Sequence, residues 1–211
     1  DRSDRSTYKL LGGSIGFYGS TLNTRQYATK GYLEKLIAQV FTGRERFEPG
    51  NPQEGYSPSP QERQSWLQIS YMKEAYHTMG PKFTLGWMAE ALYSSKNFSE
   101  NYTATMMQAG EFAPTPHSKL MYNEAFRANQ YVAAGIKPIY VLNDMFQFRT
   151  EFYGFTPIFP IKKNALNKAY YGKAFSRFEY MGEVSVICHL PFGAISAYVN
   201  HYSSPRREWN V

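Results

Sequence analysis

The sequence predicts an all-β protein, and more closely a transmembrane antiparallel β-barrel, on the strength of three observations. Apolar and polar side chains alternate along several segments, which is the period of a strand and not of a helix. These segments run for about 10 to 14 residues, longer than soluble strands of about five or six and enough for a tilted strand to cross a bilayer. Short turns also alternate with long polar segments, as in outer-membrane barrels.

Composition agrees with this fold class. The chain has 211 residues, of which 19% are charged and 17% aromatic, with 18 Tyr and 15 Phe. Aromatic residues favour strands, and tyrosine is enriched where lipid meets water. Mean hydropathy is negative, but every strand of a barrel has one polar face, so this average hides a membrane protein.

The clearest strand runs from Phe178 to Leu190. Its even positions are largely apolar and its odd positions largely polar, so one row would face lipid and the other the barrel lumen. Seven further candidates lie around 11–17, 36–40, 67–71, 82–94, 132–142, 146–152 and 195–200. Residues predicted to face lipid are Phe83, Leu85, Trp87, Phe146, Phe148, Phe152, Phe178, Tyr180, Val184, Val186, Ile195 and Val199. Residues predicted to face the lumen are Arg149, Glu151, Arg177, Glu179 and Glu183.

The connections set the topology. Gly80-Pro81, Asn143-Asp144 and Pro191-Phe192-Gly193 are tight turns. Long external loops are predicted at about 43–64, 95–130 and 156–174. Eight strands alternate in direction only if 95–130 is a single excursion, so Tyr102 to Phe112 should be loop structure. No linker divides the chain, which predicts one barrel domain over 1–211.

One motif suggests catalysis. Gly12-Gly13-Ser14-Ile15-Gly16 fits the G-x-S-x-G elbow of serine hydrolases, and Asp144 with His189 or His201 follow in the order of a triad. The elbow must end a strand and open a helix, whereas Phe17 to Thr21 has no helical pattern. A glycine-rich strand is the favoured interpretation, and a soluble β-rich hydrolase using Ser14 is the alternative.

No metal or cofactor site is predicted. The four histidines never approach ligand spacing, and the one cysteine, Cys188, lies on an apolar row. The net charge of +6 suggests an anionic partner, either lipid headgroups or nucleic acid. No pattern focuses basic residues as nucleic-acid binding requires, so outer-membrane lipid is the predicted partner and nucleic acid is not.

Three segments together carry a resemblance. Ser20 to Gly31 looks like a turn of the form D-x-R-x-x-x-x-P-x-x-G, with Asn23 in place of the acid and no proline. His189 to Ala194 is similar to a P-hydrophobic-G-P turn with its last proline replaced, and Phe126-Arg127-Ala128 is similar to an R-G-[FY] loop tip without its glycine. In this order they resemble the bacterial surface antigen family of outer-membrane insertases and translocases.

The resemblance implies a 16-stranded barrel of which this chain supplies about eight C-terminal strands, with Arg207 to Val211 entering the last. The remainder of the same barrel would complete it, and Arg127 would anchor a loop inside the lumen. Thr21 to Ala28, Ala125 to Asn129 and Tyr131 to Gly135 also look like segments of Bacteroidota proteins that carry a patatin-like phospholipase domain before the barrel. Any lipid acyl hydrolase activity would then reside upstream, and these residues would not form an enzyme.

The expected location is therefore the bacterial outer membrane. The segment would anchor an upstream domain and could also help to translocate or assemble a polypeptide, with other outer-membrane assembly or surface proteins as further partners. An independent porin-like channel is the second membrane-bound alternative.

Overall fold

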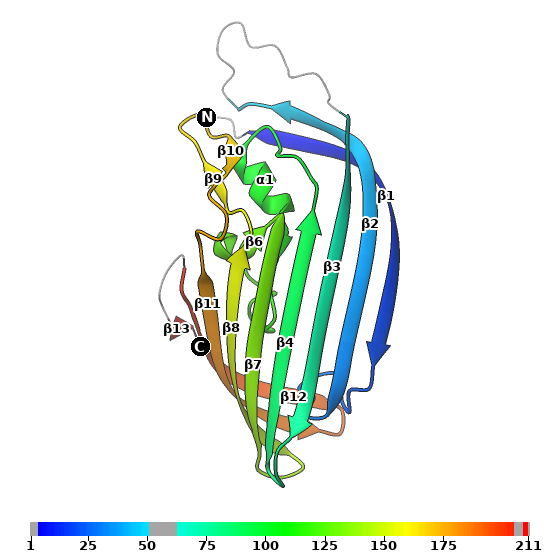
Figure 1. The fold of residues 1–211 in the computed structure, drawn as a ribbon. Coiled ribbons are helices and arrows are strands. Elements are labelled where there is room, and N and C mark those ends of the chain that lie inside the picture. Colours follow the sequence, from blue (N-terminus) through cyan, green and yellow to red (C-terminus); the bar gives the residue numbers. More distant parts are fainter. Residues whose placement is uncertain (1–3, 51–62, 205–208, 211) are drawn as a thin grey trace, which may run out of the picture.

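One antiparallel sheet dominates the computed structural model, which describes residues 4–50, 63–204 and 209–210. The strand order is β1-β2-β3-β4-β7-β8-β11-β12-β13, so neighbours in the sheet are also neighbours among the long strands of the chain (Figure 1). The bounds are β1 Arg5–Ser20, β2 Gly31–Glu48, β3 Arg63–Thr78, β4 Phe83–Ser94, β7 Gln130–Val141, β8 Phe146–Pro157, β11 Glu179–Leu190, β12 Gly193–Tyr202 and β13 Trp209–Asn210.

The eight predicted strands are thereby confirmed as β1 to β4, β7, β8, β11 and β12. Most are longer than the alternation indicated, and β2 reaches 18 residues. The difference is greatest in β1 to β3, because polar residues there occupy both faces near the strand ends and blur the period. Pro138 in β7 has no N–H to donate, yet Ile136↔Phe152 and Ile139↔Arg149 keep one register on either side of it.

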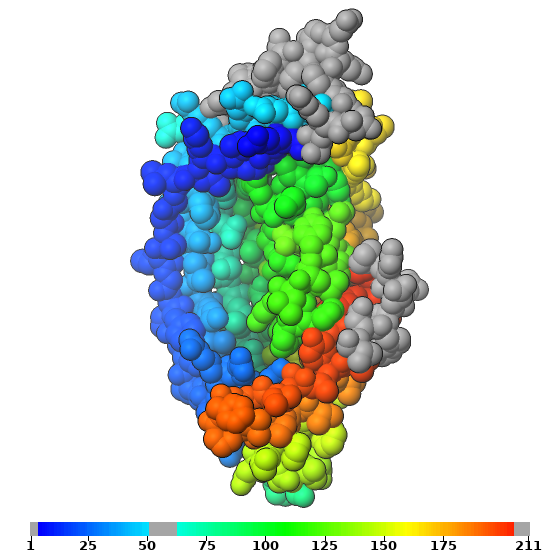
Figure 2. Space-filling view, turned by 180° about the vertical axis from the view of Figure 1, so that it is seen from behind, coloured from blue at the N-terminus to red at the C-terminus, as the bar shows by residue number. Residues whose placement is uncertain are grey.

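The sheet curls into a deep trough (Figures 1 and 2). Within the described residues, the outer edge of β1 pairs with no strand, and β12 pairs beyond β11 only with β13, through Asn200↔Asn210 and His201↔Trp209. Seen from its open side, the trough is not hollow, because the chain between β4 and β7 (green) lies inside it (Figure 2). The structure therefore shows an antiparallel sheet with a filled concave face.

Short and long connections gather at opposite ends of the sheet (Figure 1). The predicted turns at Gly80-Pro81, Asn143-Asp144 and Pro191-Phe192 join β3 to β4, β7 to β8 and β11 to β12 at one end. The three long connections lie at the other end. The first begins at 49 and the third covers 158–178, since β2 and β8 extend further than predicted. Residues 51–62 of the first lie outside the described part of the chain.

The connection 95–129, which we call the inner excursion, forms no strand of the main sheet, as predicted. It contains α1 (Tyr102–Gln108), a one-turn helix at Glu124–Phe126, and the two-residue strands β5 (Gly110–Glu111) and β6 (Arg127–Ala128). Asn101 caps α1 by accepting a hydrogen bond from the backbone N–H of Ala104 at 2.7 Å. Among the described residues, no helix is long and apolar enough to cross a membrane.

The connection 158–178, which we call the outer excursion, folds as a hairpin of β9 (Ile161–Lys163) and β10 (Ala169–Tyr171). Ile161 is buried and packs with Met106 and Ala109 at α1. The backbone N–H of Tyr102 also donates to the carbonyl of Asn167 at 2.8 Å. The hairpin is therefore fixed on the inner excursion by one of its faces.

Candidate functional site

The convex face of the sheet carries apolar side chains on all eight long strands. Its polar exceptions are a bonded group of Glu34, Tyr71 and Lys73 on β2 and β3, and charged residues near one end of β1 and β2, where Lys9 pairs with Arg44. Strand pairing places alternate residues on one face, and the large side chains of that face are exposed, including Ile15 (77%), Val40 (59%) and Val184 (52%). In a folded protein such a surface needs a cover, because contiguous exposed apolar patches of this extent mark an interface with lipid or protein. All twelve residues predicted to face lipid lie on this convex face.

The predicted lumenal residues lie on the opposite, concave face. Arg149, Glu151 and Glu183 are buried there, and Arg177 and Glu179 lie near its upper end and bond to one another at 2.8 Å. Their burial comes from the contents of the trough and not from the sheet alone, because the inner face of β1 remains largely exposed and that of β2 is half-buried.

A network of charged and aromatic polar groups fills the lower part of the trough. Arg149 donates to the Glu151 carboxylate at 3.0 Å and to the carbonyl of Ala28 at 3.0 Å. Lys137 lies 3.1 Å from Glu74, whose carboxylate also accepts from the hydroxyl of Tyr76. The charges of Arg149, Glu151, Lys137 and Glu74 thus each have an opposite charge in contact, which a dry interior requires.

Part of the concave face lacks protein partners. Glu183 Oε2, Ser185 Oγ and both amide atoms of Asn200 are buried and have no hydrogen-bond partner among the described residues. All three side chains lie on the inner side of the neighbouring strands β11 and β12. Buried polar atoms are nearly always satisfied, so this zone can hold ordered water.

The upper part of the trough is apolar. Phe112 and Phe126 of the inner excursion are each 1% exposed and pack on Phe155 of β8, with ring centroids 5.9 and 5.7 Å away. Tyr131 and Tyr153 on the neighbouring strands complete this cluster. The inner excursion therefore occupies the space that an open channel would need.

The turn 21–30 covers the lower end of the trough. The side-chain oxygen of Asn23 accepts from the backbone N–H groups of Thr29 and Lys30, both at 3.0 Å, which closes the turn. Tyr27 donates from its hydroxyl to Ser196 of β12 at 2.8 Å. In the strand order, β1 lies at one end and β12 is next to the other end. The turn that follows β1 therefore connects the two sides of the curled sheet.

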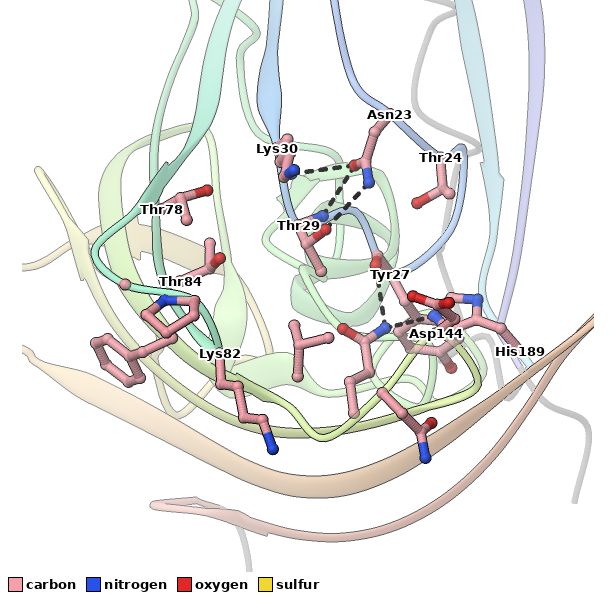
Figure 3. Close-up of a pocket in the computed structure, with 16 residues that line it drawn as sticks. Asn23, Thr24, Tyr27, Thr29, Lys30, Thr78, Lys82, Thr84, Asp144 and His189 are labelled. Carbon is pink, nitrogen blue, oxygen red and sulfur yellow. Dashed lines mark hydrogen bonds between the residues drawn. The ribbon is translucent and has the colours of Figure 1, made fainter.

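A polar cavity of about 620 Å³ lies between this turn and the turns of β3–β4 and β7–β8 (Figure 3). Lys30, Lys82, Asp144 and His189 are among its lining residues. The amide of Gln147 donates to the carbonyl of Tyr27 at 3.2 Å and bonds to the ring of His189 at 2.7 Å. These contacts fix the turn against β8 and β11. No group of residues that could hold a metal ion occurs in the described part of the chain.

Arg127, the predicted lumenal anchor, does lie in a segment that enters the trough, but its bonds stay inside that segment. Its guanidinium donates to Glu111 at 2.6 Å and to the carbonyls of Met107 and Ala109, each at 3.2 Å. Arg127 therefore ties the inner excursion together. The contacts with the sheet are made instead by Phe112 and Phe126.

Ser14 lies in the middle of β1, where it pairs with Gln39. The chain continues as a strand to Ser20, so the strand-turn-helix that a nucleophile elbow needs is not present around Ser14. Cys188 lies on the convex face opposite Phe146 and Ile195. His117 bonds to the hydroxyl of Tyr202 at 2.8 Å, whereas His189 bonds to the amide of Gln147.

Sequence reasoning missed Lys137 and the turn 21–30 as parts of the concave face, and it placed Gln147 on the polar row without assigning it a role. Lys137 could have been found, because it falls between the apolar positions of its strand and so belongs to the inner row. Gln147 also alternates with Phe146 and Phe148. The turn had no such signal, since its position depends on how far the sheet curls.

These features define a class: a long-stranded antiparallel sheet that turns apolar side chains outward and charged ones inward. The comparison with protein-family models, curated proteins and solved structures finds no match. The resemblance to the surface antigen family therefore stays a prediction.

Proposed function

We propose that this chain is the membrane-embedded part of a bacterial outer-membrane β-barrel, whose convex face contacts lipid. The apolar convex face carries this proposal. Val40, Ile15 and Val184 are more than half exposed, whereas Arg149 and Glu151 are buried on the concave side, which is the reverse of a soluble sheet. Strands of 10 to 18 residues are also long enough to span a bilayer.

Within the described residues, the outer edge of β1 and the part of β12 that β13 does not cover support a larger assembly. Unpaired N–H and C=O groups cost several kcal/mol each in hydrocarbon, so a membrane-embedded sheet needs further strands to close it. The resemblance assigns those strands to the remainder of the same barrel. In this proposal the chain anchors an upstream domain, such as a patatin-like one, and any acyl hydrolase chemistry belongs to that domain.

The filled trough favours anchoring over conduction. Phe112, Phe126 and the charged network occupy the space between the concave face and the open side. We expect the purified full-length protein to give no steady ion conductance in planar bilayers. Large, stable conductance would favour the porin-like alternative.

Tryptophan quenching by brominated lipids tests the membrane proposal. Trp87 lies on the convex face of β4, whereas Trp66 is 9% exposed on the concave face and stacks on Phe41 at 5.1 Å. Two reconstituted variants isolate these residues, Trp66→Phe with Trp209→Phe, and Trp87→Phe with Trp209→Phe. We expect strong quenching of Trp87 and weak quenching of Trp66. Weak quenching of both would contradict a lipid-facing convex face.

Adjacent substitutions in β2 give an independent test. Val40 is 59% exposed on the convex face, and Gln39 faces the concave side. In lipid, Val40→Arg should lower the free energy of unfolding by about 2–4 kcal/mol at mid-membrane depth. If water covered this face, the same change should stay within about 0.5 kcal/mol. Gln39→Arg is the matched control and should be mild in both cases.

A further inference from the structure

The positive charge of this protein is concentrated in the outer excursion. Residues 158–178 contain five Lys or Arg and no Asp or Glu, in a chain whose net charge is +6. The rest of the chain is nearly balanced. The inner excursion, for example, has three Lys or Arg and three Glu. The outer excursion is therefore a candidate contact for an anionic partner.

Most of these charges are not neutralised within the protein. Arg177 bonds to Glu179 at 2.8 Å, and Lys168 lies 3.9 Å from Glu100 in an exposed pair. Lys162, Lys163 and Lys173 are exposed and have no carboxylate within ion-pair distance among the described residues.

The hairpin presents two of these lysines side by side. The face of the hairpin that contains Ile161 packs on α1. Lys162, which pairs with Tyr170, lies on the opposite face and points away from α1. The side chain of Lys162 runs across Gly172, where a Cβ would lie 2.8 Å from its Cε. This places Lys162 next to the backbone that carries Lys173.

Exposed aromatic rings accompany the lysines. Phe175 is 62% exposed and has a φ of +51°, which is unusual for a bulky residue. Its backbone N–H donates to the carbonyl of Ile158 at 2.9 Å, so the strained turn is held in place. Tyr170 is 45% exposed. Exposed rings beside unpaired lysines have no explanation in the packing of this protein.

The outer excursion joins the convex face directly. Phe178 is 66% exposed, and its ring lies over Gly154 of β8, where a Cβ would approach it to 3.0 Å. Gly154 pairs with Tyr180 on the convex face. Phe178, the last residue of the outer excursion, therefore joins the lysine-bearing segment to the end of the apolar surface.

We propose that the outer excursion binds anionic phosphate-bearing headgroups at the membrane surface next to the barrel. The apolar convex face would set the depth, the rings of Phe175 and Phe178 would lie at headgroup level, and Lys162 and Lys173 would contact phosphates. Aromatic residues prefer this interface, and long lysine chains extend to it. This inference rests on the proposed membrane location and adds a lipid class and a site to it.

The test uses the full-length protein and two double variants. Lys162→Gln with Lys173→Gln removes two unpaired charges of the outer excursion. Lys35→Gln with Lys119→Gln is the matched control, because these lysines lie on the concave side and in the inner excursion. Proteins are equilibrated in mixed micelles of phosphatidylglycerol and phosphatidylcholine, and the retained lipids are counted by mass spectrometry.

We expect the native protein and the control to retain phosphatidylglycerol preferentially. The outer-excursion variant should lose that preference by roughly tenfold or more, since each basic residue near an anionic surface strengthens binding about fivefold. Raising salt to about 1 M should remove the preference of the native protein. Equal retention by both variants would overturn the inference.

Two further measurements separate the sources of failure. If soluble inorganic polyphosphate or duplex DNA binds more tightly than anionic micelles, and the same lysines are needed, the site is for soluble polyanions and the inference is wrong. If Trp87 is quenched by brominated lipid but the lysine variant keeps its preference, only the headgroup site fails. If Trp87 is not quenched, the membrane proposal fails first.

Discussion

The inner and outer excursions leave the same end of the sheet, but one lies inside the trough and the other lies outside it. The inner excursion enters the trough, and its Phe112 and Phe126 are each 1% exposed. The outer excursion stays outside, and its Phe175 and Phe178 are 62% and 66% exposed. Both contain aromatic residues, so aromatic content does not decide where a long connection goes.

Charge balance separates the two segments. The inner excursion carries as many acidic as basic residues, and Arg127 is matched by Glu111 inside it. The outer excursion has five basic residues and no acid. Burying unpaired ammonium groups is far more costly than burying a matched pair. The trough therefore holds the segment whose net charge is zero, and the strongly basic segment stays outside.

Removing one aromatic ring from each excursion should give the largest contrast. Phe126→Ala leaves a cavity beside Phe155 and Tyr202 and should lower the free energy of unfolding by about 3–5 kcal/mol. Phe175→Ala should change it by less than about 0.5 kcal/mol. Urea unfolding of the reconstituted protein measures both. Equal losses would mean that the outer excursion is also part of the packed core.

Each excursion also has an arginine paired with a glutamate, which allows a matched test. Arg127 pairs with Glu111 of the same excursion, and Arg177 pairs with Glu179 of β11. Arg127→Ala should lower the free energy of unfolding by about 2 kcal/mol, because three hydrogen bonds from a largely buried guanidinium are lost. Arg177→Ala removes a more exposed pair and should cost at most about 1 kcal/mol.

Limited proteolysis then locates the effect of these arginine substitutions. In the Arg127→Ala variant, proteolytic cleavage should increase within 95–129, where the hydrogen-bond partners of Arg127 lie. A larger effect from Arg177→Ala would show that the outer excursion depends on its ion pair.

A further prediction concerns a half-buried lysine of the inner excursion. Lys96 lies over the rings of Trp66 and Tyr8 at 4.9 and 5.6 Å, and burial lowers its pKa from 10.5 to about 8. Between these pH values the unfolded chain holds a proton that the folded protein has released. Stability should therefore rise with pH from about 8 to 10.5.

Two substitutions isolate this contribution. Lys96→Met removes the titrating group, and Lys96→Arg keeps a charge that does not titrate in this range. Both should lose the part of the pH dependence that belongs to Lys96, as measured by urea unfolding at several pH values. An unchanged slope in Lys96→Met would show that Lys96 is not the group responsible.

Much of the fold could be predicted because a strand has an exact period of two. Along β11, alternation alone places Val184 and Val186 on one face and Glu183 on the other, and the structure agrees. Turn residues such as Asn143-Asp144 act locally, so their positions were also predictable. The bounds of β1 to β3 were predicted less well, because polar residues lie on both faces of these strands.

The candidate site was less predictable, because its parts come from distant segments. The contact of Arg149 with the carbonyl of Ala28 joins residues far apart in the chain. No local pattern indicated a partner for Arg127, and the resemblance implied a role in the lumen. The tertiary structure assigns its bonds to Glu111 and nearby carbonyls.

The sequence by itself determined which residues form strands, which side of each strand is apolar, and where net charge accumulates. These properties depend only on local geometry and composition. The tertiary structure decided how far the sheet curls, which excursion enters the trough, and that Lys162 lies beside the chain carrying Lys173. Those outcomes depend on packing between segments distant in the chain, for which no local pattern exists.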